Sequence, residues 1–342
     1  MQTNVRTLKV FAQIVVALVL IAAMVGQVSG VSAASSNPKY EDYVVGNAGD
    51  VTTTTNAGLL LMGGGTDVDA AFQWMISKSG GGDFVVIRAS GTDAYNPYIY
   101  DFGGIDSVET IIIQNRAAAS DPFVVSQIRN AEALFIAGGD QSNYVDYWKG
   151  TPVEDAIHYL VSRNVPIGGT SAGLAIMGEF VFSAANGTIY SDTALKNPYN
   201  RKVALDRDFL VLPYLNGVIT DSHFVTRDRM GRLLTFLARI VQDGWSAEAK
   251  GVGIDERTAL AVESDGSATV LGSGAAYFLK TPGLPEVCQP RTPLTYQNIN
   301  VYRVSGSATF NFSTWTGTGG TSYQLDVDNG VVTSTQAGGS IY

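Results

Sequence analysis

Residues 169–173 read GTSAG, a serine enclosed by small residues. The segment follows an apolar run and precedes a helical pattern, which is the strand–turn–helix context of a nucleophilic serine on a sharp turn. Small neighbours relieve the clashes of such a turn, and the backbone N–H of Ala172 would be available to a developing oxyanion. The pattern predicts Ser171 as a nucleophile; the alternative is an ordinary glycine turn with a capping serine.

A nucleophilic serine needs a base, and the chain has only two histidines. His158 lies beside Glu154 and Asp155 in a helical stretch, where its neighbours indicate a solvent-facing position. His223 follows an apolar strand and precedes an amphipathic helix, so we expect it on the same rim as Ser171. The sequence therefore predicts His223 as the base, with a structural histidine as the alternative.

The third member of such a constellation is an acid that orients the imidazole. Three carboxylates lie close to the ends of expected strands: Asp221, Asp255 and Glu256. Their spacing along the chain does not choose among them.

The elements that must position these residues alternate between buried strands and amphipathic helices. We expect strands at 56–65, 83–90, 108–115, 133–141 and 165–169, and helices at 66–81, 120–131, 151–164 and 226–244. This alternation predicts an α/β fold with a mostly parallel sheet and helices on both faces. Ligands of such sheets bind beyond the carboxyl ends of the strands.

Three of the expected strands end in glycines, at 63–65, 138–139 and 168–169, and we expect all three turns to open on one rim. The helix at 151–164 has the clearest beginning. Thr151 is its expected N-cap, Pro152 its first residue, and Glu154 would complete a capping box.

Beyond residue 250 the pattern changes to short strands and turns. We expect a main domain over 35–285 and a C-terminal β extension over 286–342 that packs on it. The N-terminal residues 1–34 combine Arg6 and Lys9 with a short apolar run and a small-residue cleavage site after Ala33 or Ala34, which is typical of a signal peptide. The alternative is a membrane anchor.

Composition narrows the class of protein further. The formal net charge is −9, and cleavage of the signal peptide would remove Arg6 and Lys9 and make it −11. We therefore expect no nucleic-acid partner. Cys288 is the only cysteine, which excludes a disulfide within the chain and cysteine-rich zinc sites. We expect a protein exported to the periplasm or the medium, without a stable membrane anchor after cleavage and with no metal or organic cofactor.

Six segments in a fixed order resemble one family over roughly residues 58–280: LLLMGGG, ALFIAGGDQ, VPIGGTSAG, ALKNPYNRKVAL, LNGVITDSHFVTRDRMGRLL and GVGIDERTAL. The family is that of the cyanophycinases and aspartyl dipeptidases, which are serine peptidases, and the chain resembles its cyanophycinase branch more closely. The resemblance implies a sheet like that of class I glutamine amidotransferases and a homodimer.

The resemblance also implies a catalytic triad of Ser171, His223 and Glu256. It implies that the N–H groups of Gly139 and Ala172 form the oxyanion hole.

The resemblance implies a substrate site as well, with contacts from Gln141, Asp221, Arg227, Arg229 and Arg232. On a helical wheel Arg227 lies near the rim, Arg229 flanks the core face and Arg232 points largely away from the core. Guanidinium groups suit carboxylates, whereas the alternative for all three arginines is a solvated helix face.

One position departs from the family pattern, because Ser222 stands between Asp221 and His223 where cyanophycinases have a substrate-holding glutamine. The expected activity is hydrolysis of peptide or isopeptide bonds of aspartyl residues. Cyanophycin, another β-aspartyl linkage and ordinary Asp-X peptides all stay open as substrates.

Two other functions compete with this one. An esterase or lipase of the α/β-hydrolase type shares the G-x-S-x-G pattern and orders its triad serine, acid, histidine, so Asp206 or Asp208 would supply the acid. More than a hundred residues then follow His223, which is not expected of that fold. A non-catalytic binding protein on the same fold is the second alternative.

Overall fold

The computed structural model describes residues 40–342, and the expected signal peptide over 1–34 lies outside the described residues. Within residues 40–342 ten strands form a first sheet. Their order across that sheet is β1 (Tyr40–Gly46), β4 (Ser107–Ile113), β3 (Asp83–Arg88), β5 (Ala133–Ile136), β6 (Ile167–Thr170), β2 (Gly58–Met62), β11 (Thr258–Glu263), β12 (Ser267–Gly272), β15 (Thr309–Asn311) and β16 (Thr316–Thr318).

Only the centre of the first sheet is parallel. The ladders that join β4, β3, β5, β6 and β2 run parallel, and the ladders to β1 and from β2 through β11 to β16 run antiparallel. The expectation of a mostly parallel sheet is therefore wrong, although strands and helices do alternate. Short turns join β11 to β12 and β15 to β16, and strands joined in this way pair antiparallel, whereas parallel neighbours need a crossover of a dozen residues or more.

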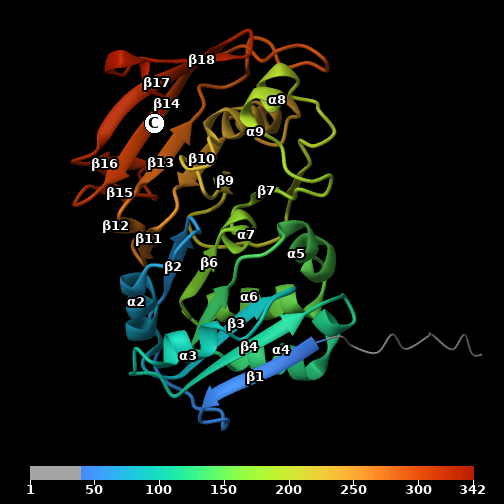
Figure 1. Cartoon of the computed structure of the whole chain (residues 1–342), viewed down its shortest axis with the longest axis vertical. Helices are drawn as coiled ribbons and strands as arrows, with labels where there is room; N and C mark the ends of the chain where they lie inside the picture. The colour runs from blue at the N-terminus through green and yellow to red at the C-terminus, as the bar shows by residue number, and fades with distance from the viewer. Residues whose placement is uncertain (1–39) are drawn as a thin grey trace, which may run out of the picture. The chain divides into compact units, whose positions relative to one another are not determined.

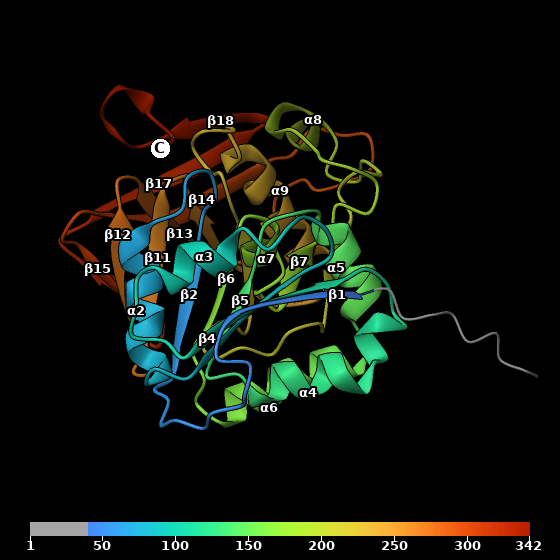
Figure 2. The same cartoon turned by 60° about the horizontal axis from the view of Figure 1, so that its bottom comes forward.

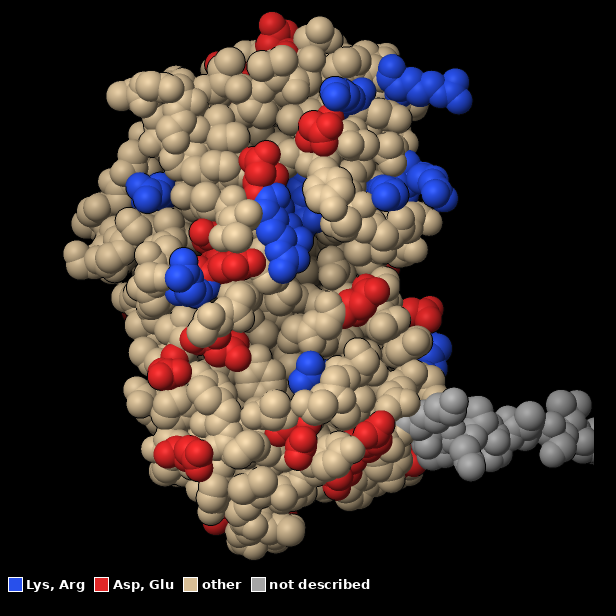
Figure 3. Space-filling view, in the orientation of Figure 1, with Lys and Arg blue, Asp and Glu red and all other residues tan. Residues whose placement is uncertain are grey.

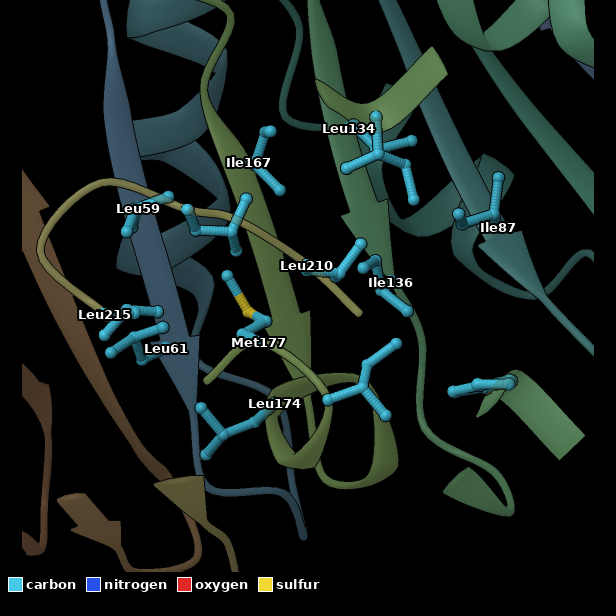
Figure 4. Close-up of a cluster of buried hydrophobic side chains, with 14 of the residues drawn as sticks. Leu59, Leu61, Ile87, Leu134, Ile136, Ile167, Leu174, Met177, Leu210 and Leu215 are labelled. Carbon is cyan, nitrogen blue, oxygen red and sulfur yellow. The ribbon is translucent and has the colours of Figure 1, made fainter. Parts of the chain in front are cut away.

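Helices cover both faces of the parallel centre (Figure 2). On one face pack α2 (Asp69–Ser79) and α3 (Tyr95–Tyr100), and on the other pack α4 (Pro122–Asn130) and α6 (Pro152–Ser162). Strand β2 shows why both faces need cover, because all five of its residues are buried. Its alternate side chains Leu59 and Leu61 join the core on the α4 and α6 side (Figure 4), and Leu60 and Met62 join the core under α2.

A second sheet contains eight strands of the described chain. Its order is β18 (Val331–Ser334), β17 (Thr321–Asp328), β14 (Tyr296–Ser305), β13 (Ala275–Lys280), β10 (Lys250–Ile254), β9 (Val218–Asp221), β7 (Phe180–Phe182) and β8 (Leu205–Arg207). The helices α8 (Ser191–Lys196) and α9 (Met230–Gln242) pack on one face of this sheet (Figure 1). Strands β7, β9 and β10 are parallel to one another, and its other ladders are antiparallel.

Strands that follow residue 285 are built into both sheets. β14 pairs with β13 in the second sheet, and β15 pairs with β12 in the first. Between them the rings of Phe278 and Phe310 stack with their centroids 3.6 Å apart. The boundary between 285 and 286 stays a prediction.

Two of the three expected glycine turns are loops, and the third is part of a strand. Residues 63–65 and 138–139 follow β2 and β5 and form loops, whereas Gly168 and Gly169 lie inside β6 and are buried. A Cβ at Gly168 would lie 2.7 Å from Met75 Sδ, so close packing rather than a turn requires this glycine. No helix within residues 40–342 has the length and apolar character needed to cross a bilayer.

Candidate active site

Ser171 lies on a sharp turn between β6 and the short helix α7 (Ala172–Ala175). Its backbone has φ 53° and ψ −111°, a conformation that non-glycine residues rarely adopt. Small residues make the turn possible, since a Cβ at Gly169 would lie 2.8 Å from the carbonyl carbon of Gly173, and a Cβ at Gly173 would collide with the carbonyl oxygen of Ile136. The turn exposes the Ser171 hydroxyl to a cavity.

A hydrogen-bonded relay connects Ser171, His223 and Glu256. Ser171 Oγ lies 2.7 Å from His223 Nε2, and His223 Nδ1 lies 2.6 Å from Glu256 Oε1. The serine follows β6, the histidine follows β9 and the glutamate follows β10. These are the relations of a nucleophile, a base and the acid that orients the base.

The environment of His223 favours its neutral form. Burial lowers the pKa of His223 most, the hydrogen bond with Glu256 acts in the opposite direction, and the nearby charges of Arg227 and Arg229 lower it further. The net pKa lies below the ordinary value of 6.5. A neutral imidazole can accept the proton of Ser171 at neutral pH.

The other two candidate acids are occupied elsewhere. Asp255 accepts hydrogen bonds from the backbone N–H groups of Val225 and Thr226, at 3.1 and 2.9 Å. Asp221 pairs with Arg232. Of the three carboxylates that sequence left open, the one that reaches the imidazole is Glu256.

The glycine loop 63–65 packs against the relay, and its role was not foreseen from sequence beyond its place on the rim. Gly63 O accepts a hydrogen bond of 2.8 Å from His223 N. Gly64 has φ +93°, and a Cβ there would lie 2.6 Å from His223 Cε1 and 3.1 Å from Ser171 Cβ. A Cβ at Gly65 would lie 3.0 Å from Glu256 Cβ. Each member of the relay therefore has a glycine at close contact.

Gly139 and Ala172 both line the cavity beside Ser171. Within the described residues neither backbone N–H donates to a protein acceptor. Tyr144, on helix α5 (Gln141–Trp148), fixes the loop that carries Gly139, because its hydroxyl donates to Ala137 O at 2.9 Å and to Gly138 O at 3.1 Å. Two free N–H groups beside a nucleophile are what an oxyanion hole requires.

The arginine expected to point away from the core is the most deeply buried of the three. Arg232 is 2% exposed and donates from Nε to Asp221 Oδ2 at 2.7 Å. The helical wheel gave the wrong orientation for Arg232, because α9 is covered on almost every side. Even polar positions of this helix are buried. Asp221, itself 2% exposed, is thus a partner of the arginines.

Arg229 and Arg227 lie nearer to the cavity mouth. Arg229 donates from Nη1 to Ser222 O at 2.8 Å and pairs with Asp221 at 3.4 Å, and burial lowers its pKa to about 10. The side chain of Arg227 is 54% exposed, and its Nε lies 3.6 Å from Glu256 Oε1. All three arginines line the cavity, and so do two exposed carboxylates, Asp140 and Asp228.

The cavity itself has a volume of about 360 Å³. Gln141 lines it and donates to Phe182 O at 3.4 Å, and Ser222 lines it beside the base. Tyr190, which sequence reasoning missed, stands at the cavity with 68% of its surface exposed. Figure 3 shows that basic side chains gather in a compact column near the middle of the face drawn, with acidic side chains on its borders.

Residues invoked by the esterase alternative lie outside this arrangement. Asp206 accepts a hydrogen bond of 2.7 Å from Lys149, and Asp208 lies 3.4 Å from Arg207. His158 Nε2 accepts from the backbone N–H of Val211 at 3.0 Å. The acid that contacts His223 follows it in the chain, which is not the order of an α/β-hydrolase.

Comparison with known proteins places most of the chain in one family. The model of peptidase family S51 matches residues 59–270. A cyanophycinase from Nostoc sp. is 28% identical over 212 residues, which cover 60% of this chain and 66% of that protein. A cyanophycinase from Synechococcus elongatus is 26% identical over 216 residues, or 62% of each chain. This chain thus spans just under two thirds of the length of these relatives.

Among solved structures, a peptidase from an acI-B1 Actinobacterium superposes with a TM-score of 0.48 at 16% sequence identity. The match covers 66% of this chain and 91% of that chain.

Proposed function

The chain belongs to peptidase family S51, as its sequence predicts, and from this membership and the geometry of its site we propose that it is a serine peptidase acting on aspartyl bonds. The bond is a peptide or isopeptide bond whose carbonyl belongs to an aspartyl residue. The observation that carries the proposal is the relay from Ser171 Oγ through His223 to Glu256, with hydrogen bonds of 2.7 and 2.6 Å.

The first step forms an acyl-enzyme. Ser171 Oγ attacks the carbonyl carbon while its proton passes to His223 Nε2. Glu256 accepts a hydrogen bond from Nδ1–H, holds the reactive tautomer and stabilises the imidazolium that forms. The N–H groups of Gly139 and Ala172 stabilise the negative charge on the former carbonyl oxygen.

The second step releases the products. His223 returns the proton to the amine nitrogen as the C–N bond breaks. Water then enters, gives a proton to His223 and attacks the acyl carbon, so that Ser171 regains its hydrogen and an aspartyl carboxyl group is formed.

The arginines supply the selectivity for an acidic substrate. Arg229 and Arg232 share the single carboxylate of Asp221, so this pair of guanidinium groups keeps one positive charge that is not offset by Asp221. A carboxylate of the substrate would compensate it, because planar guanidinium groups bind carboxylates well.

The experiment that tests this function is a substrate panel. The purified protein is incubated with cyanophycin, β-Asp-X dipeptides, Asp-X dipeptides and a short-chain ester, and the products are identified by mass spectrometry. We expect cleavage at aspartyl bonds and none by the Ser171→Ala variant. Turnover of the ester alone would favour the esterase alternative, and aspartyl cleavage that survives in the alanine variant would exclude Ser171 as nucleophile.

We also propose that the enzyme acts outside the cytoplasm, on the sequence of residues 1–34. N-terminal sequencing of protein recovered from the periplasm or medium should begin just after Ala33 or Ala34. Recovery with Arg6 and Lys9 still attached, in the cytoplasm, would refute export.

A further inference from the structure

Asp228 stands between the two arginines nearest the cavity mouth and lines the same cavity. Its backbone has φ +47°, in the left-handed region. Its carboxylate makes no ion pair within 4 Å to any residue of the described chain, although Arg227 and Arg229 are its neighbours. A carboxylate in that place would be expected to pair with an adjacent guanidinium and so compete with an acidic substrate.

The partner that Asp228 does have is Tyr342. The Tyr342 hydroxyl donates a hydrogen bond of 2.8 Å to Asp228 Oδ1 and accepts one of 2.9 Å from the backbone N–H of Met230, the first residue of α9. Burial and the Asp228 carboxylate raise the pKa of Tyr342 above its ordinary value, so that the hydroxyl keeps its proton. The Tyr342 hydroxyl thus contacts both the Asp228 carboxylate and the first residue of α9.

Aromatic contacts hold the Tyr342 ring in place. It meets Phe224 and Tyr277 edge to face, with centroids 5.8 Å away in both pairs. Phe224 follows the base His223 directly and is fully buried. The main chain beside the ring is also fixed, because Tyr323 Oη donates to Ile341 O at 3.1 Å. Figures 1 and 2 both mark this end of the chain beside the C-terminal strands.

We propose that Tyr342 is a positioning residue of the substrate site, which holds the Asp228 carboxylate away from Arg227 and Arg229 and so keeps a further negative charge from competing with an anionic substrate for these two guanidinium groups. The identity of that substrate rests on the proposed function. The hydrogen bond between Tyr342 and Asp228 does not depend on it.

The kinetic test compares Tyr342→Phe with the wild-type protein. The variant keeps the ring contacts and loses the hydroxyl, so KM for an aspartyl substrate should rise roughly three- to tenfold, the value of one hydrogen bond, while kcat stays unchanged. Tyr98→Phe is the matched control, since it also removes a hydroxyl that donates to an aspartate, Asp69 at 2.7 Å, but neither residue lines the cavity, and its KM should equal that of the wild type.

A second substitution separates this role from a merely structural one. In the double variant Tyr342→Phe/Asp228→Asn the freed side chain has no charge with which to neutralise the arginines, so KM should return toward the wild-type value. A KM that stays raised in the double variant, or does not rise in Tyr342→Phe, overturns the proposal.

A readout without substrate keeps the test independent of the proposed function. Phenylglyoxal labels free guanidinium groups, and peptide mapping by mass spectrometry gives the labelling rate of Arg227. The rate should fall in Tyr342→Phe, recover in the double variant and stay unchanged in Tyr98→Phe. An unchanged or faster labelling rate of Arg227 in Tyr342→Phe contradicts the proposal, even if no aspartyl substrate is cleaved. If the labelling rates follow the expected pattern but the protein cleaves no aspartyl substrate, only the proposed function is overturned.

Discussion

Ser171 and His223 share an unusual backbone, with φ of 53° and 48°. Left-handed conformations of non-glycine residues carry strain and concentrate where a side chain must be aimed. Here both residues of the hydrogen-bonded pair have this conformation, and the glycine loop 63–65 packs beside them.

Gly64 gives a prediction at this scale. Gly64→Ala should lower kcat by roughly a hundredfold or more, because displacement of reacting groups by about 1 Å is that costly and the new Cβ would lie 2.6 Å from His223 Cε1. Gly103→Ala is the control, since Gly103 also has a positive φ, +71°, but nothing lies within 4 Å of its Cβ position. Steady-state kinetics decides; equal activity of the two variants would refute the close contact.

The lowered pKa of His223 predicts the acid side of the pH profile. The base must be unprotonated, so kcat/KM rises with pH through the pKa of His223, and the midpoint should lie below 6.5. Arg227 contributes to this lowering, so Arg227→Gln should move the midpoint to higher pH. A wild-type midpoint above 6.5, or a downward shift in the variant, would contradict the assignment of the base.

Sequence identified part of this relay on physical grounds. Ser171 followed from its crowding by small residues, and His223 from the scarcity of histidines. The acid could not be chosen by spacing, because Asp221, Asp255 and Glu256 all lie at strand ends; only family resemblance selected Glu256.

At the scale of elements, α5 shapes the loop after β5. Tyr144 Oη contacts Gly138 O, and that carbonyl belongs to the same peptide unit as the Gly139 N–H. Holding the oxygen fixes the direction in which the N–H points. The helix thereby positions a donor of the proposed oxyanion hole.

Tyr144→Phe should therefore lower kcat roughly ten- to hundredfold, somewhat less than the loss of an oxyanion donor, with KM unchanged. The ring would keep its stacking on Trp148, with centroids 4.3 Å apart, so the fold should persist. Tyr147→Phe, on the same helix, serves as control. A rise in KM with constant kcat would assign Tyr144 to substrate binding instead.

Helix boundaries show what local sequence does and does not determine. Thr151 is the N-cap of α6 and Pro152 its first residue, as predicted, but the capping box does not form. The Thr151 hydroxyl donates to Trp148 O at 2.6 Å, and Glu154 accepts from Gly150 N at 2.6 Å. The Thr151 hydroxyl and the Glu154 carboxylate thus bind backbone groups of the preceding turn instead of each other's backbone, which the capping pattern alone does not reveal.

At the scale of the whole molecule, the parallel centre was predictable and its antiparallel flanks were not. Strands β2 to β6 are continuous apolar runs separated by helices, which is the signature of parallel pairing. Strand β11 reads as equally apolar, yet it pairs antiparallel with β2 because the chain reaches that edge from the second sheet. The direction from which the chain enters this edge of the sheet depends on tertiary packing, so the local sequence of β11 does not reveal it.

One hydrophobic cluster contains residues of both sheets, so we expect a single cooperative unfolding transition. Phe310 is 2% exposed and stacks on Phe278 across the sheets, and Phe310→Ala should lower the free energy of unfolding by about 3–5 kcal/mol. Calorimetry should show one transition at lower Tm, whereas Val331→Ala, at a site 63% exposed, should change little. Two separate transitions would indicate that the C-terminal strands fold independently.

The measurement that tests the central claim most directly is kcat of Ser171→Ala, His223→Ala and the double variant on one aspartyl substrate. Residues that act as a unit are not additive, so each single variant should lose roughly 10⁴-fold or more and the double variant no more than that. Losses that multiply in the double variant, or a single variant within tenfold of wild type, would contradict a catalytic relay through Ser171 and His223.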